Sequence, residues 1–124
     1  MTASSRLSKK KRTETLQRIA EEARSGQRFL ISSHENPEGD ALGSILALGL
    51  ALKGLGKEVL VLNQDPTPEM LSFLPGAEEI THQAPADGRF DVAFALDCGD
   101  KTRLGEEFTK VQKIRKVINI DHHI

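Results

Sequence analysis

The sequence predicts an α/β fold in which a parallel sheet carries helices on both faces. Two observations indicate it. Four short segments are continuous apolar runs, which is typical of parallel strands buried on both sides. Segments with helical periodicity separate these runs, so helices and strands alternate along the chain. Together they indicate a Rossmann-like architecture, and a length of 124 residues allows one domain.

The N-terminal region predicts a tail followed by a helix. Residues 1–12 are rich in Ser, Lys and Arg without periodicity, so we expect a flexible basic tail. The run Lys9–Arg12 within it is interpreted as solvated rather than as a nucleic-acid-binding arm. From residue 13, apolar positions recur at helical spacing until Gly26, which predicts the first helix.

The remaining elements follow in order. Strands are expected at residues 28–33, 59–62, 91–96 and 116–120, and helices at 41–55, at about 69–74 and, more weakly, at 102–113. The helix at 41–55 is apolar on almost every side, which predicts that it is buried.

Composition excludes several classes of protein. The chain has 17 Lys and Arg against 18 Asp and Glu, so it lacks the strongly basic surface of a typical duplex-DNA-binding domain. The lone Cys98 excludes an internal disulfide framework and any multi-cysteine metal site, and it favours a cytoplasmic location. The longest apolar-rich run, at 41–52, is shorter than the ~20 residues that span a bilayer. We therefore expect neither duplex DNA nor a membrane as a partner.

Acidic and imidazole side chains follow three of the predicted strands. They are His34, Glu38 and Asp40 after the strand at 28–33, Asp97 and Asp100 after that at 91–96, and Asp121, His122 and His123 after the last. Ligands of open parallel sheets bind outside the carboxyl ends of the strands, so these side chains are expected at one edge. Each of them alone has an ordinary structural interpretation, and their joint placement carries the inference. His82 and Asp65 are not part of such a set of acidic and imidazole residues after a strand, and they are interpreted as structural.

This set of side chains predicts a metal site. Carboxylates gathered in a small volume repel one another unless a cation compensates them. Nitrogen and oxygen ligands without thiolate suit Mn²⁺, Fe²⁺, Zn²⁺ or Co²⁺. The ligands exceed what one tetrahedral site needs, which indicates two ions, and metal pairs ~3.5–4 Å apart recur in phosphoryl hydrolysis. Asp40 is expected to cap the helix at 41–55, where Gly43 and Ser44 would let a phosphate approach the helix N-terminus.

Three motifs in this order resemble those of a known family, the DHH phosphoesterases. They are His34-Glu-Asn-Pro-Glu-Gly-Asp40-Ala-Leu-Gly-Ser44, Leu96-Asp97 and Asp121-His122-His123, and the resemblance covers residues 28–124. Within the family, the sequence around Asp40 most resembles the subgroup that degrades short oligoribonucleotides and removes the 3′-phosphate of 3′-phosphoadenosine 5′-phosphate (pAp). The resemblance implies a hydrolase that uses two divalent ions, Mn²⁺ by preference, on short oligoribonucleotides or nucleotides.

The resemblance also implies roles for the motif residues. One metal would be held by His34, Glu38 and Asp97, and the other by Asp40, Asp97 as a bridge and His122. His123 would contact the scissile phosphate, Asp121 would orient the cluster, and Gly43 and Ser44 would lie beside the phosphate.

The sequence departs from the family pattern in two respects. Glu38 stands where the family usually has Asp, and the chain ends before the family's fourth motif and C-terminal substrate domain. We therefore expect residues 13–124 to be the N-terminal part of a catalytic domain, inactive alone, with its last strand as a partly exposed edge.

Alternative functions stay open at this point. One is a catalytically silent nucleotide-binding or sensor module, and another is a cyclic-dinucleotide phosphodiesterase; a homodimer is also left open. A dinucleotide-binding domain of an oxidoreductase is disfavoured, because no Gly-x-Gly-x-x-Gly follows the first strand.

Overall fold

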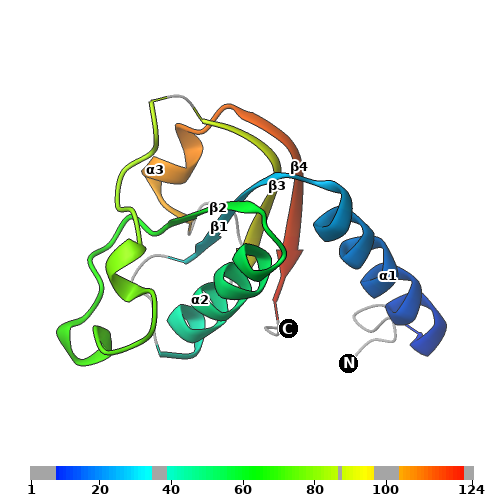
Figure 1. Cartoon of the computed structure of the whole chain (residues 1–124), viewed down its shortest axis with the longest axis horizontal. Coiled ribbons are helices and arrows are strands. Elements are labelled where there is room, and N and C mark those ends of the chain that lie inside the picture. Colours follow the sequence, from blue (N-terminus) through cyan, green and yellow to red (C-terminus); the bar gives the residue numbers. More distant parts are fainter. Residues whose placement is uncertain (1–7, 35–38, 87, 97–103, 122–124) are drawn as a thin grey trace.

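The computed structural model describes residues 8–34, 39–86, 88–96 and 104–121. Its elements, in chain order, are α1 (Lys9–Ser25), β1 (Arg28–Ser33), α2 (Gly39–Gly54), β2 (Glu58–Leu62), the 3₁₀ helices η2 (Glu69–Leu71) and η3 (Ala77–Glu79), β3 (Arg89–Leu96), α3 (Glu106–Thr109) and β4 (Lys113–Ile120). The strands form one sheet in the order β2-β1-β3-β4, and every pairing is parallel. The predicted α/β fold is confirmed (Figure 1).

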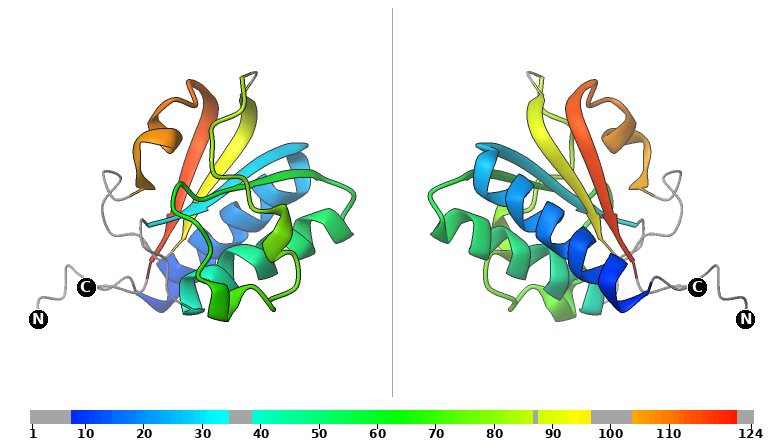
Figure 2. Two further views of the ribbon diagram at one scale, coloured as in Figure 1. Left: turned by 90° about the vertical axis from the view of Figure 1, so that its left-hand side faces the viewer. Right: turned by 90° about the vertical axis from the view of Figure 1, so that its right-hand side faces the viewer.

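The helices cover both faces of this sheet. Figure 2 shows α1 and α2 on one face and α3 on the other. Alternate residues of β1 serve the two layers: Phe29 and Ile31 pack with α2, whereas Leu30 packs with Phe108 of α3. This two-sided burial explains why the strands appear in the sequence as continuous apolar runs. Among the described residues, no helix is both long and apolar enough to cross a membrane.

Helix α1 begins earlier than the sequence analysis predicted. The Ser8 hydroxyl accepts a hydrogen bond from the Lys11 N–H at 3.1 Å and caps the helix, which starts at Lys9. The expected tail at residues 1–12 is therefore wrong for Lys9–Arg12, which form the first turn of α1. Residues 1–7 lie outside the described residues.

The segment before β4 also differs from its prediction. A helix was expected at 102–113, of which 102 and 103 lie outside the described residues, but α3 spans only Glu106–Thr109. Strand pairing explains the difference, because Lys113 is already in register with Arg89 of β3. The chain therefore leaves the helix early in order to enter the sheet. At its far side β4 is an edge of the described sheet, and Ile120 is 43% exposed.

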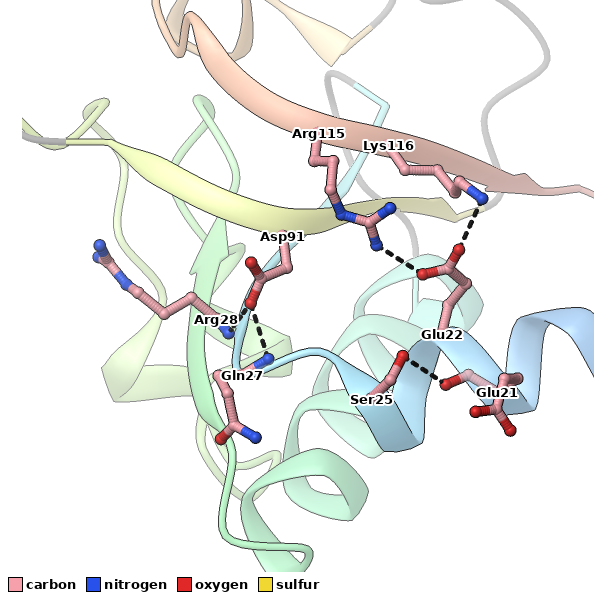
Figure 3. Close-up of polar contacts among 8 residues, drawn as sticks. All are labelled: Glu21, Glu22, Ser25, Gln27, Arg28, Asp91, Arg115 and Lys116. Atoms are coloured by element: carbon pink, nitrogen blue, oxygen red, sulfur yellow. Dashed lines mark hydrogen bonds and ion pairs between the residues drawn. The ribbon is translucent and has the colours of Figure 1, made fainter.

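Two carboxylates bind α1 and its turn to the sheet near the amino ends of the strands (Figure 3). Asp91 Oδ2 accepts the backbone N–H groups of Arg28 at 2.9 Å and Gln27 at 2.7 Å, and these bonds hold the pKa of Asp91 below its usual value. Glu22 forms ion pairs with Lys116 and Arg115 of β4, each at 2.6 Å, which lower the pKa of Glu22. The Glu22 ion pairs hold the C-terminal half of α1 against β4, and the Asp91 bonds hold the turn after α1 to β3.

Candidate functional site

Three neighbouring strands of the sheet end in register. Ser33 of β1 pairs with Leu96 of β3, and Leu96 pairs with Ile120 of β4. Adjacent strands lie ~4.8 Å apart, so the loops that follow these three residues start side by side at one edge of the sheet. The three predicted metal-site motifs begin in these loops. The register therefore supports the prediction that they meet at one edge.

His34 is held at this edge by backbone and side-chain contacts. It follows β1 directly and is 7% exposed. Its carbonyl accepts a hydrogen bond from Asn63 Nδ2 at 3.5 Å, and the preceding hydroxyl, Ser33 Oγ, donates to the Leu96 carbonyl at 2.7 Å. The backbone that carries His34 is thus tied to the ends of both neighbouring strands.

Asn63 is a residue that sequence reasoning underrated. It follows β2, is 2% exposed, and its Oδ1 accepts the Asp65 N–H at 3.3 Å while its amide nitrogen reaches His34. Its carbonyl accepts a hydrogen bond from His82 Nδ1 at 2.7 Å, which fits the structural interpretation of His82. The sequence does place this polar residue directly after an apolar strand. An asparagine side chain is not ionisable, however, so it is a weaker indication of a metal site than the acidic and imidazole side chains of the other loops.

The N-terminus of α2 presents Asp40, Gly43 and Ser44 at the surface. The helix begins at Gly39, so Asp40 lies inside its first turn and the expectation that it caps the helix is wrong. Asp40 Oδ1 accepts the Ala41 N–H at 3.0 Å, and Ser44 Oγ donates to the Asp40 carbonyl at 2.7 Å. A Cβ added at Gly43 would meet nothing within 4 Å. A phosphate could therefore approach this turn closely, and the helix dipole favours a negative charge there.

Several predicted site residues lie outside the described residues: Glu38, Asp97, Asp100, His122 and His123. Asp121 is described; it follows β4 directly and is half-buried. Within the described ranges, no three His, Cys, Asp or Glu residues form a group that could hold a metal ion. The described donors are the buried imidazole of His34 and the carboxylates of Asp40 and Asp121, a nitrogen and oxygen set that fits a divalent ion of the Mn²⁺ type.

Comparisons with known proteins agree with this picture. The family model "DHH family, N-terminal domain" matches residues 28–124. The chain is 41% identical over 93 residues to the bifunctional oligoribonuclease and PAP phosphatase NrnA of Thermus thermophilus, covering 75% of this chain and 27% of that protein. It is also similar to the crystal structure of an exopolyphosphatase-related protein from Bacteroides fragilis, with a TM-score of 0.77 and 25% identity, over 90% of this chain and 35% of that one. The chain thus spans about a quarter to a third of the length of these two relatives.

Proposed function

This chain belongs to the DHH family of phosphoesterases, whose N-terminal domain it contains, and on that premise we propose that it is the metal-binding part of a phosphoesterase acting on short oligoribonucleotides and on nucleotides such as pAp. The reaction is hydrolysis of a phosphodiester or phosphomonoester bond. The observation that carries the proposal is the register of Ser33, Leu96 and Ile120, since it starts three ligand-bearing loops at adjacent points. The 41% identity to the oligoribonuclease and PAP phosphatase supports the substrate class.

The proposal assigns the following roles to the chain's own residues. His34, Glu38 and Asp97 hold one divalent ion, and Asp40, Asp97 and His122 hold the other. His123 contacts the scissile phosphate, and Asp121 orients its neighbours. When bound, two ions of the Mn²⁺ class lower the pKa of a water and neutralise phosphate charge.

The first turn of α2 orients the substrate. The Ala41 N–H is bonded to Asp40 Oδ1, and the other N–H groups at the start of the helix are the ones that offer hydrogen bonds to phosphate oxygens. The open space at Gly43 lets the phosphate come close to this turn. The exposed Ser44 hydroxyl, which donates to the Asp40 carbonyl, lies in the same turn. The backbone of His34 is buried and its carbonyl accepts a hydrogen bond from Asn63, so the starting point of this ligand is fixed relative to β2.

The test is hydrolysis of labelled di- to pentaribonucleotides and of pAp by the protein that carries these residues, with the 124-residue chain assayed beside it. We expect turnover with Mn²⁺, loss of turnover in EDTA, and loss in Asp97→Asn, whereas His82→Gln remains active. The 124-residue chain is expected to bind the ions. Turnover that persists in EDTA would contradict the proposal.

A catalytically silent nucleotide-binding module is the second candidate. Glu38 favours it, because its extra methylene displaces the carboxylate relative to the family's usual Asp, and metal sites tolerate little displacement. The Glu38→Asp variant separates the two candidates. If wild-type protein binds pAp without consuming it while Glu38→Asp turns it over, the silent module is correct.

A further inference from the structure

The first turn of α1 carries a concentrated positive charge for which the proposed chemistry has no role. We call Lys9, Lys10, Lys11 and Arg12 the basic turn; all four are exposed. Among the residues that the structure describes, none of the four forms an ion pair, whereas the other end of the helix is bound to β4 through Glu22. The whole chain has a net charge of −1, so this cluster is a strong local excess.

The basic turn opposes the local stability of the helix. Cations are unfavourable at a helix N-terminus because the backbone dipole is positive there, and the first turn of α1 contains no acidic residue. Lys9 and Arg12 are also three residues apart, so they are neighbours of like charge on the helix surface. Places where a sequence breaks a local rule without a compensating contact are expected at functional sites.

The basic turn lies toward the same end of the sheet as the metal-site loops. Helix α1 leads into the amino end of β1, so it runs back along the sheet, antiparallel to the strands. Its 17 residues extend about 25 Å, from the Glu22 ion pairs near the start of β4 toward the carboxyl ends of the strands. Both views of Figure 2 show the first turns of α1 and the end of β4 at the same side of the molecule.

A groove begins about one helical turn after the basic turn and runs between α1 and β4. It has a volume of about 390 Å³ and is lined on the α1 side by Thr15, Arg18 and Ile19 and on the β4 side by residues that include Ile118 and Asn119. Asn119 precedes Asp121 by two residues. Glu22 and Lys116 also line the groove, but they are paired with each other, so Arg18 is its cation without an ion pair among the described residues. A half-buried apolar floor at Ile19 and Ile118 completes a mixed polar and apolar lining of the kind that binds small ligands.

We propose that the basic turn and this groove bind the phosphates of a single-stranded oligonucleotide whose scissile end lies at the metal site. This inference rests on the proposed function. The flexible backbone of a single strand can follow the groove, and its phosphates would meet the cations of the basic turn that share the groove side of α1, Lys11 and Arg12. The consequence is selectivity by length: strands of several nucleotides gain affinity from the basic turn, whereas pAp gains none.

The experiment measures binding of a fluorescent hexaribonucleotide by anisotropy in EDTA, where turnover is absent. The test variant is Lys11→Gln with Arg12→Gln, because these two cations precede Thr15 by four and three residues and so lie on the groove side of α1. The matched control is Arg89→Gln with Lys113→Gln, which removes one Arg and one Lys, exposed register partners at the amino end of the sheet. Far-UV circular dichroism verifies that all three proteins keep their helices.

The expected results follow from counterion release. Each lost phosphate contact to a single strand reduces the slope of log Kd against log salt by about 0.7, so the test variant should lose about 1.4 and bind roughly tenfold more weakly. The control should bind within about twofold of wild type. Competition by unlabelled pAp should be the same in wild type and in the test variant.

Two outcomes overturn the inference. One is equal affinity of the test and control variants for the hexaribonucleotide. The other is binding of wild type to phosphatidylserine vesicles but not to the hexaribonucleotide, which would make a lipid surface the partner. Neither outcome depends on turnover. Hydrolysis is measured separately with Mn²⁺, so a failure of the proposed function can be distinguished from a failure of this inference.

Discussion

The substitution Asp91→Asn tests how the turn between α1 and β1 is attached to the sheet. One oxygen of Asp91, Oδ2, accepts two backbone N–H groups, from Gln27 at 2.7 Å and from Arg28 at 2.9 Å (Figure 3). Asparagine preserves the shape and one carbonyl acceptor but removes the negative charge. The change therefore isolates the part of these bonds that depends on charge.

The expected cost is about 1–2 kcal/mol in the free energy of unfolding. Hydrogen bonds to charged groups contribute about 1.5–3 kcal/mol, and bonds between neutral groups about 0.5–1.5 kcal/mol. The difference is about 1 kcal/mol for each of the two bonds. The two bonds are exposed or only partly buried, so water recovers part of the free energy that each bond loses. The total for both bonds is therefore expected between about 1 and 2 kcal/mol.

The pH dependence of this cost has a definite sign. The two N–H donors lower the pKa of Asp91 in the folded state, so the unfolded chain takes up the proton first as the pH falls. The stability that the carboxylate contributes is present above about pH 4 and is lost as the pH falls below that value. Wild type and Asp91→Asn should therefore differ at about pH 7 and converge toward about pH 3.

Urea unfolding followed by circular dichroism measures both effects. The control is Glu78→Gln, a neutralisation at an exposed position outside α1, which should change the free energy of unfolding by less than about 0.5 kcal/mol. A difference between wild type and Asp91→Asn that is absent at about pH 7, or that stays constant down to about pH 3, would refute the assigned role of Asp91.

Three other substitutions have expected outcomes. Gly43→Ala should stabilise the chain by up to about 1 kcal/mol in urea, because the space at its Cβ is open, and should reduce turnover by filling the approach to the α2 N-terminus; unchanged turnover would contradict that approach. Asn63→Leu removes the amide that reaches His34, so Mn²⁺ affinity measured by calorimetry should fall about 10-fold or more; wild-type affinity would show that Asn63 has no positioning role. Phe94→Ala deletes a ring stacked on Phe29 at 6.0 Å in the core, and its unfolding free energy should drop by about 3–5 kcal/mol; a drop below about 1 kcal/mol would mean that the core is packed otherwise.

The strands were the most predictable part of this fold. The bounds of β1 agree with the prediction, since burial on both faces selects an uninterrupted apolar run. The start of α1 was missed because four successive cations contradict the usual signals of a helix N-terminus, and the cap at Ser8 precedes them. The length of α3 depends on where β4 joins β3, which is a tertiary effect that local periodicity does not contain.

The residue types of the candidate site stay a prediction from the sequence, and the structure bears only on where the strands that carry them end. Chain order and the rule for parallel sheets place the three motifs at one edge, and the register of the strand ends supports that placement. The contact between Asn63 and His34 depends on the neighbouring position of β2, which the sequence alone does not reveal. Asp40 was expected to cap the helix, but α2 already begins at Gly39, so Asp40 lies within its first turn.

Calorimetric titration of the 124-residue chain with Mn²⁺ tests the central claim most directly. The variant is Asp97→Asn, which removes the proposed bridging ligand, and the control is Asp65→Asn, a neutralisation after β2 at the same end of the sheet. We expect Mn²⁺ binding in wild type and Asp65→Asn, with Asp97→Asn losing most of the affinity. Equal Mn²⁺ binding by all three proteins, or none by a wild-type chain with native circular dichroism, would contradict a metal centre built from these loops.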